Sequence, residues 1–173
     1  IGELYASTTE ALGMKKMEHE YKVMGLASYA KEKYFADIKL NVFDKIIKFD
    51  SKTGLQATYK STRNLTPMLV NAIKGERFDN VAGALQKCTE DIVLKIFEYR
   101  TKKFPKHKII FTGGVVMNVK INLTLHYIYG DKIRFMPSGG AESLPIGALA
   151  CDICPNKLKT PNLLFFGPEY KSS

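Results

Sequence analysis

The sequence lacks the features that mark several special classes of protein. No apolar run among its 173 residues is long enough to span a bilayer. The opening stretch IGELYASTTE has neither the basic region nor the apolar run of a signal peptide. Its 13 glycines and 7 prolines are too few for a low-complexity chain. We therefore expect a globular protein that is cytoplasmic and has no membrane partner.

Cysteine is also scarce, since only Cys88, Cys151 and Cys154 occur. Three cysteines cannot all pair, which excludes a disulfide framework and fits a reducing compartment. Cys88 falls on an apolar helical face and is predicted to belong to the core. Cys151 and Cys154 form a single C-x-x-C, whereas a structural zinc site would need a second pair. We interpret this spacing as a coincidence.

Basic residues outnumber acidic ones, and the formal net charge is +9. The lysines are spread along the chain with no run of five or more, a pattern that does not favour a nucleic-acid partner. A nucleotide or phosphate ligand would use only part of this charge. The chain begins at Ile1, without Met, inside a segment that reads as structured. We expect it to be a piece of a longer protein.

The hydrophobic spacing predicts helices in the first half of the chain and alternating strands and helices in the second. Expected helices cover 3–12, a segment entered near Tyr21, 31–44, 64–75 and 79–103, with Asp79 as the N-cap of the last. Residues 45–60 are expected to form a β-hairpin whose turn contains Gly54. Residues 107–114 predict a short buried strand, followed by a helix over 115–129, a strand over 131–137 and a glycine-rich loop that opens a further helix.

Strand–loop–helix–strand–loop–helix is the pattern of an α/β fold. Both strands feed glycine-rich loops that open helices, so unpaired backbone N–H groups and the positive ends of helix dipoles should face one cleft. Gly113 and Gly114 follow the first strand, and Asn118 comes one helical turn later. Its amide suits a ribose, a purine edge or a phosphate oxygen. A tight turn with a helix-capping amide fits the same residues.

Two stretches near the start resemble a family of carbamoyltransferases that includes nodulation protein U and antibiotic-tailoring O-carbamoyltransferases. Gly2, Tyr5, Thr9, Leu12 and Gly13 match the first signature. Eight consecutive residues, EYKVMGLA from 20 to 27, match the second. Later stretches FDNVAGALQKCTED, FTGGVVMNVKINLTL, PSGGAESLPIGALA and FFGPEYKSS resemble further family motifs in the same order. The resemblance thus covers almost the whole chain.

The resemblance implies a lobe of the actin/Hsp70/sugar-kinase (ribonuclease H-like) superfamily with an added β-hairpin. Residues 1–160 would be the C-terminal lobe of the catalytic domain, and residues 161–173 a linker towards a further domain. That domain would make carbamoyl-adenylate from carbamoyl phosphate and ATP. The lobe described by this chain would help to pass the carbamoyl group to a hydroxyl of a sugar or natural-product acceptor. With only half of the cleft present, we expect this chain alone to be folded but inactive, and a homodimer is one way to cover its exposed face.

The resemblance also implies site residues. Gly113, Gly114 and Asn118 would cradle the adenylate, Glu20 and Lys22 would lie near its ribose or phosphate, and Gly140 of the second loop would line the same site. Related enzymes bind an iron-type divalent metal. The metal-binding Asp of the family falls on Ala141, so no metal is expected here unless the neighbouring acid, Glu142, replaces it. A nucleotide-dependent small-molecule kinase and a degenerate, non-catalytic binding module are the alternative functions.

Overall fold

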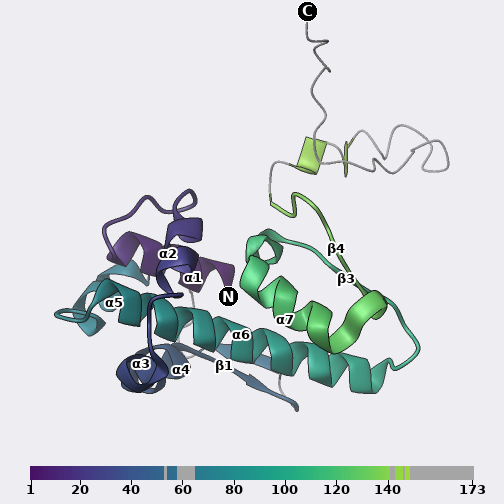
Figure 1. Ribbon diagram of the computed structural model, residues 1–173, viewed down its shortest axis with the longest axis horizontal. Coiled ribbons are helices and arrows are strands. Elements are labelled where there is room, and N and C mark those ends of the chain that lie inside the picture. Colours follow the sequence, from purple (N-terminus) through teal and green to yellow (C-terminus); the bar gives the residue numbers. More distant parts are fainter. Residues whose placement is uncertain (53, 58–64, 141–142, 146, 149–173) are drawn as a thin grey trace, which may run out of the picture.

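The fold is organised around one long helix, α6 (Phe78–Lys103), which runs through both halves of the molecule (Figure 1). The computed structural model describes residues 1–52, 54–57, 65–140, 143–145 and 147–148. At 1.5 Å per residue, α6 is about 39 Å long. Its N-cap is Arg77, so the prediction of Asp79 as the cap was wrong. Asp79 lies in the first turn, where it favours the helix dipole and pairs with Arg77 at 3.0 Å.

Short helices from the first part of the chain lie around the first half of α6 and share a hydrophobic core with it. They are α1 (Gly2–Ala11), α2 (Glu20–Leu26), α3 (Glu32–Ile38), the π-helical turn η1 (Lys39–Phe43), α4 (Asp44–Ile46) and α5 (Thr66–Ala72). The single helix predicted over 31–44 is thus interrupted by a π-helical turn. Gly13 and Gly75 have positive φ angles just beyond α1 and α5, as expected of helix-ending glycines.

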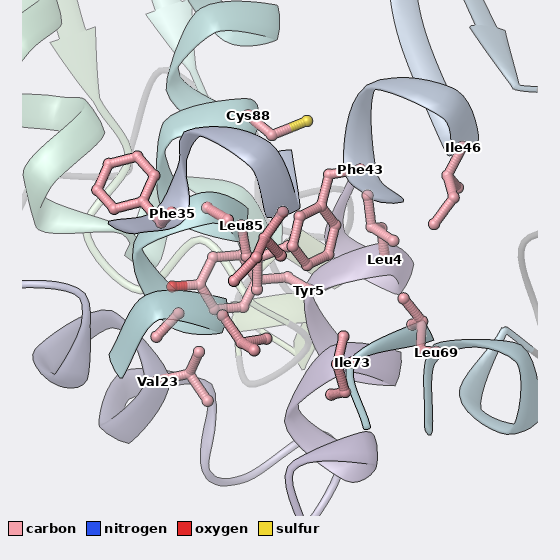
Figure 2. Close-up of a cluster of buried hydrophobic side chains, with 14 of the residues drawn as sticks. Leu4, Tyr5, Val23, Phe35, Phe43, Ile46, Leu69, Ile73, Leu85 and Cys88 are labelled. Carbon is pink, nitrogen blue, oxygen red and sulfur yellow. The ribbon is translucent and has the colours of Figure 1, made fainter. Parts of the chain in front are cut away.

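These helices enclose the larger of two hydrophobic cores (Figure 2). Phe43, Leu69 and Leu85 are fully buried in it. Cys88 is 1% exposed, which confirms its predicted place in the core. Burial is the main cause that raises the pKa of its thiol to about 12, so the thiol stays protonated and unreactive at neutral pH. Figure 2 also shows the ring of Tyr5 among the apolar side chains of this core.

A close approach between α3 and α6 makes one glycine of the core critical. A Cβ added to Gly83 would lie 2.5 Å from the Cβ of Ala30 and 2.8 Å from the ring of Phe35. We expect Gly83→Ala to lower the free energy of unfolding by about 1–3 kcal/mol, because overpacking forces the two helices apart. Urea denaturation of the full-length protein measures this effect.

Gly25 provides the matched control, since a Cβ there meets nothing within 4 Å in helix α2. Gly25→Ala should raise the free energy of unfolding by about 0.4–1 kcal/mol, because alanine restricts the unfolded chain. Equal stability changes in the two variants would contradict the close packing of α3 against α6.

The predicted hairpin is present as β1 (Ile47–Asp50) and β2 (Gly54–Ala57). The two strands pair antiparallel, with Ile47 opposite Ala57 and Asp50 opposite Gly54. Gly54 has a φ of 81°, a value that glycine adopts without strain.

The second half of the molecule contains a β–α–β unit. Its elements are β3 (Ile109–Phe111), the 3₁₀ turn η2 (Gly114–Met117), α7 (Val119–Tyr129), the 3₁₀ turn η3 (Gly130–Lys132) and β4 (Ile133–Phe135). The strands pair parallel, with Ile109 opposite Ile133 and Phe111 opposite Phe135. This unit and the helices around α6 give the protein its α/β character, as the sequence predicted.

The smaller core lies between β3–β4, α7 and the second half of α6. Val93, Ile121, Leu125 and Ile133 are its buried members. The strand expected to be buried is covered on one face only, because Ile110 is 74% exposed. The helix predicted after the second glycine loop and the linker predicted over 161–173 fall largely or wholly outside the described residues. Within the part that is described, no helix is both long and apolar enough to cross a membrane.

Candidate functional site

A cavity of about 900 Å³ lies where the two halves of the molecule meet. Its walls come from the start of α1, the loop before α2, α2 itself, the middle of α6 and the segments that follow β3 and β4. Ile1, Gly2, Glu3, Tyr5, Ala6, Met17, Glu20, Tyr21, Met24, Thr89, Gly114, Val115, Met117, Asn118, Gly139, Gly140 and Leu144 line it. Its volume is in the range of small-molecule sites, about 300–1,000 Å³.

The first glycine segment forms a tight turn directly after β3. Gly113 has φ 96° and ψ 166°, a backbone conformation that is essentially restricted to glycine. The N–H of Val116 donates to the carbonyl of Gly113 at 2.9 Å and closes the turn. The side-chain Nδ2 of Asn122 donates to the carbonyl of Val116 at 2.6 Å and fastens the turn to α7. A Cβ on Gly114 would meet nothing within 4 Å, so this residue leaves open space at the cavity wall.

The second glycine segment packs directly against the first. A Cβ on Gly139 would lie 2.0 Å from Cγ1 of Val116 and 3.0 Å from the carbonyl oxygen of Gly113. Only glycine allows this approach, which brings Gly140 to the cavity wall. The sequence predicted Gly140 at the site but assigned nothing to Gly139. Two consecutive glycines after a strand were the available signal.

A buried network of polar side chains forms one wall of the cavity and joins α1, α6 and the start of α7. The hydroxyl of Tyr5 donates to Oε1 of Gln86 at 3.0 Å. Asn118 and Gln86 exchange two hydrogen bonds, from Nδ2 to Oε1 at 2.9 Å and from Nε2 to Oδ1 at 3.1 Å. Nε2 of Gln86 also donates to Glu90 at 2.7 Å, and Oδ1 of Asn118 accepts from the backbone N–H of Ile121 at 3.2 Å. Asn118 is therefore both the N-cap of α7 and a cavity residue.

The described lining of the cavity offers a bound ligand neutral hydrogen-bond donors and no cationic side chain. Burial, followed by the charges of Glu90 and Glu20, raises the pKa of the Tyr5 hydroxyl, which stays protonated in the network. Glu3 is paired with Lys16 at 2.5 Å. No lysine or arginine is among the described residues that line the cavity. A bound anion would therefore depend on backbone N–H groups and on the amide of Asn118.

The predicted site residues are brought together only in part. Gly114, Asn118, Glu20 and Gly140 line the cavity. Gly113 does not line it but shapes the turn. Lys22 is exposed outside the lining, with its Nζ 3.0 Å from Nε2 of His19. The predicted contact of Lys22 with a ribose or phosphate stays a prediction.

Glu20 has a structural contact besides its place in the lining. Its Oε1 accepts a hydrogen bond of 2.7 Å from the backbone N–H of Met17. Met17 has a φ of 67°, unusual for a residue with a side chain. Glu20 thus holds the loop that carries Met17 to the edge of the cavity.

The metal prediction falls on residues that the structure does not describe. Ala141, Glu142, Cys151 and Cys154 all lie outside the described ranges. Across the ranges that are described, no three His, Cys, Asp or Glu side chains gather in a group that could hold a metal ion. These side chains therefore do not supply the ligand set that an iron-type metal would need.

Comparison with known proteins finds similarity over most of the chain. The family model of the carbamoyltransferase N-terminus matches residues 1–148. The chain is 32% identical to the uncharacterized protein MJ1051 of Methanocaldococcus jannaschii, covering 99% of this chain and 33% of that relative. It is 28% identical to the uncharacterized protein sll1178 of a Synechocystis species, covering 86% of this chain and 26% of that relative. The chain thus spans about a third or less of the length of these relatives.

Proposed function

We propose, from the premise that this chain belongs to the carbamoyltransferase family, that its cavity holds the adenylate of a carbamoyl donor. The whole protein would then transfer the carbamoyl group to a hydroxyl of a small-molecule acceptor. Carbamoyl phosphate and ATP would supply the donor as carbamoyl-adenylate. Because the chain spans about a third of its relatives, the complete activity is proposed for the full-length protein.

The observation that carries this proposal is the contact between the two glycine segments at the cavity. Gly113 and Gly139 abut, and Gly114 and Gly140 line the space beside them. Glycine lets a phosphate or carbonyl oxygen reach the backbone, where a side chain would hold it away. The amide of Asn118 adds a donor at the same place. Such a wall suits a ligand with a phosphate ester and needs no basic side chain.

The proposed reaction exchanges one carbon–oxygen bond for another. The bond between the carbamoyl carbon and the phosphate oxygen of the adenylate breaks, and a bond to the acceptor oxygen forms. The acceptor hydroxyl releases its proton to solvent, and AMP leaves with the electron pair of the broken bond. The role of this chain is to bind and orient the donor, which is a large part of such rates. A divalent metal in the full-length protein would need ligands from outside the described residues of this chain.

We further propose that residues 1–160 form the C-terminal lobe of an actin/Hsp70-like catalytic domain and that 161–173 lead to a further domain. The parallel β3–α7–β4 unit, with its ligand cavity at the strand ends, supports this assignment. A cytoplasmic location, the absence of a nucleic-acid partner and a contact of Lys22 with the bound donor belong to the same proposal.

The test is a product analysis of the full-length protein. The protein is incubated with carbamoyl phosphate, ATP and a panel of hydroxylated acceptors, and nucleotides and acceptors are identified by mass spectrometry. We expect AMP and a carbamoylated acceptor, both of which disappear when carbamoyl phosphate is omitted. ADP with a phosphorylated acceptor would identify a kinase instead. Nucleotide binding without turnover on any acceptor would favour a non-catalytic module.

A further inference from the structure

The hydrogen bonds of the buried network run in a direction that one backbone group fixes. The N–H of Ile121 can only donate, so the atom of Asn118 that faces it must be the carbonyl oxygen. The Gln86 atom beside that oxygen must then be its amide nitrogen, which also agrees with its contact to Glu90. The remaining Gln86 oxygen must accept from both Asn118 and Tyr5. Every donor and acceptor in the network is thus determined.

The hydrogen-bonding groups that the network leaves unused determine what the wall offers to a ligand. Gln86 uses both of its N–H groups and both oxygen lone pairs. The oxygen of Asn118 accepts twice. Within the described part of the chain, the second N–H of Asn118 and the lone pairs of the Tyr5 oxygen have no partner. Asn118 can therefore only donate to a ligand, and Tyr5 can only accept.

We propose that Tyr5 and Asn118 form a fixed acceptor–donor pair that reads a ligand group carrying an N–H donor beside an acceptor. Gln86 acts as the positioning residue, because its Oε1 holds both partners, at 3.0 Å and 2.9 Å. Tyr5 is 8% exposed and Gln86 3% exposed, so water competes little for these bonds. A ligand with an acceptor facing Tyr5 would leave buried polar groups unpaired and would bind poorly.

This inference rests on the proposed function and narrows the group that is recognised. Two parts of a carbamoyl-adenylate carry a donor beside an acceptor: the carbamoyl group, with its NH₂ and carbonyl oxygen, and the adenine edge, with its amino group and N1. Both groups place an amino donor beside an acceptor. Whichever of the two faces the pair, a ligand without that amino group should bind more weakly. An acetyl-adenylate lacks the first donor, and a purine riboside lacks the second.

The experiment is a cycle of protein and ligand changes, measured by calorimetry on the full-length protein. The stable donor mimic 5′-O-sulfamoyladenosine is compared with its methylsulfonyl counterpart and with the purine analogue that lacks the amino group. Each ligand is titrated into the wild type, Tyr5→Phe and the control Tyr129→Phe. Tyr129 is partly buried, packs against the smaller core and does not line the cavity. Urea denaturation checks that the variants remain folded.

For the wild type and Tyr129→Phe, we expect the ligand that carries the recognised amino group to bind about tenfold more tightly than the analogue without it, as one hydrogen bond would give. In Tyr5→Phe that preference should fall to about onefold. Loss of the preference for the sulfamoyl ligand assigns the pair to the carbamoyl group, and loss of the preference for adenine assigns it to the base. If the wild type binds the mimic but both preferences survive in Tyr5→Phe, the inference is wrong and the proposed function stands. If the wild type binds none of the ligands, both are wrong.

Discussion

Gly114→Val is expected to abolish carbamoyl transfer by the full-length protein while leaving its stability almost unchanged. A Cβ at this position meets no atom within 4 Å, and the residue lines the cavity. The branched side chain therefore has room in the empty protein and fills space that the donor must occupy. Surface substitutions of this kind change the free energy of unfolding by about 0.5 kcal/mol or less. Transfer rates and urea denaturation curves of the same preparations measure the two effects.

Gly139→Ala is the matched control for this prediction. Its Cβ would lie 2.0 Å from Cγ1 of Val116, so overpacking should cost about 1–3 kcal/mol of stability. Activity lost in this variant would come with a shifted unfolding midpoint, whereas activity lost in Gly114→Val would not. Wild-type transfer by Gly114→Val would show that the segment is a turn without a ligand.

Asn118→Asp should reduce the affinity for the sulfamoyl mimic roughly 5- to 150-fold, since leaving a buried acceptor of the ligand unpaired costs about 1–3 kcal/mol. An aspartate still caps α7 by accepting from the N–H of Ile121, and its charge favours the helix dipole. It nevertheless replaces the amide donor with an oxygen that faces Oε1 of Gln86, 2.9 Å away. With the phosphate-containing carbamoyl donor itself, the new charge would add an electrostatic repulsion that the neutral mimic does not experience. Calorimetric titration measures the loss.

The control for the added charge is Asn80→Asp, in the first turn of α6 and away from the cavity lining. A negative charge there favours the helix dipole, so ligand affinity should remain at the wild-type value. Affinity retained in Asn118→Asp would show that Asn118 serves only as a helix cap. A loss in both variants would indicate a long-range effect of charge.

The fold could be predicted where one physical cause dominated the local sequence. Helical spacing of apolar residues located α6, and the apolar strands before two glycine segments located the β3–α7–β4 unit. The positive φ values of Gly54 and Gly113 agree with the turns expected there. The start of α6 was misplaced because Asp79 already lies within the first helical turn, and no side chain caps the helix at Arg77. The exposure of Ile110 could not be read locally, because it depends on which elements cover the sheet.

The site was predicted less completely, because it is assembled by contacts between distant segments. Gly114, Asn118, Glu20 and Gly140 were predicted to share one site, and all four line one cavity. Tyr5 and Gln86 received no site role, although both lie in stretches that resemble the family. They are 81 residues apart, and only the packing of α1 against α6 brings the hydroxyl to the amide. Hydrogen-bond direction, which limits what the wall can bind, has no signature in the sequence.

The most direct test of the account is a crystal structure of the full-length protein with 5′-O-sulfamoyladenosine. We expect the ligand to occupy the cavity beside the two glycine segments. Its sulfamoyl and ribose oxygens should approach the backbone at Gly114 and Gly140, and one of its polar groups should accept from Nδ2 of Asn118. A ligand bound elsewhere, with this cavity filled by water or by another part of the chain, would contradict the central claim that these segments hold the carbamoyl donor.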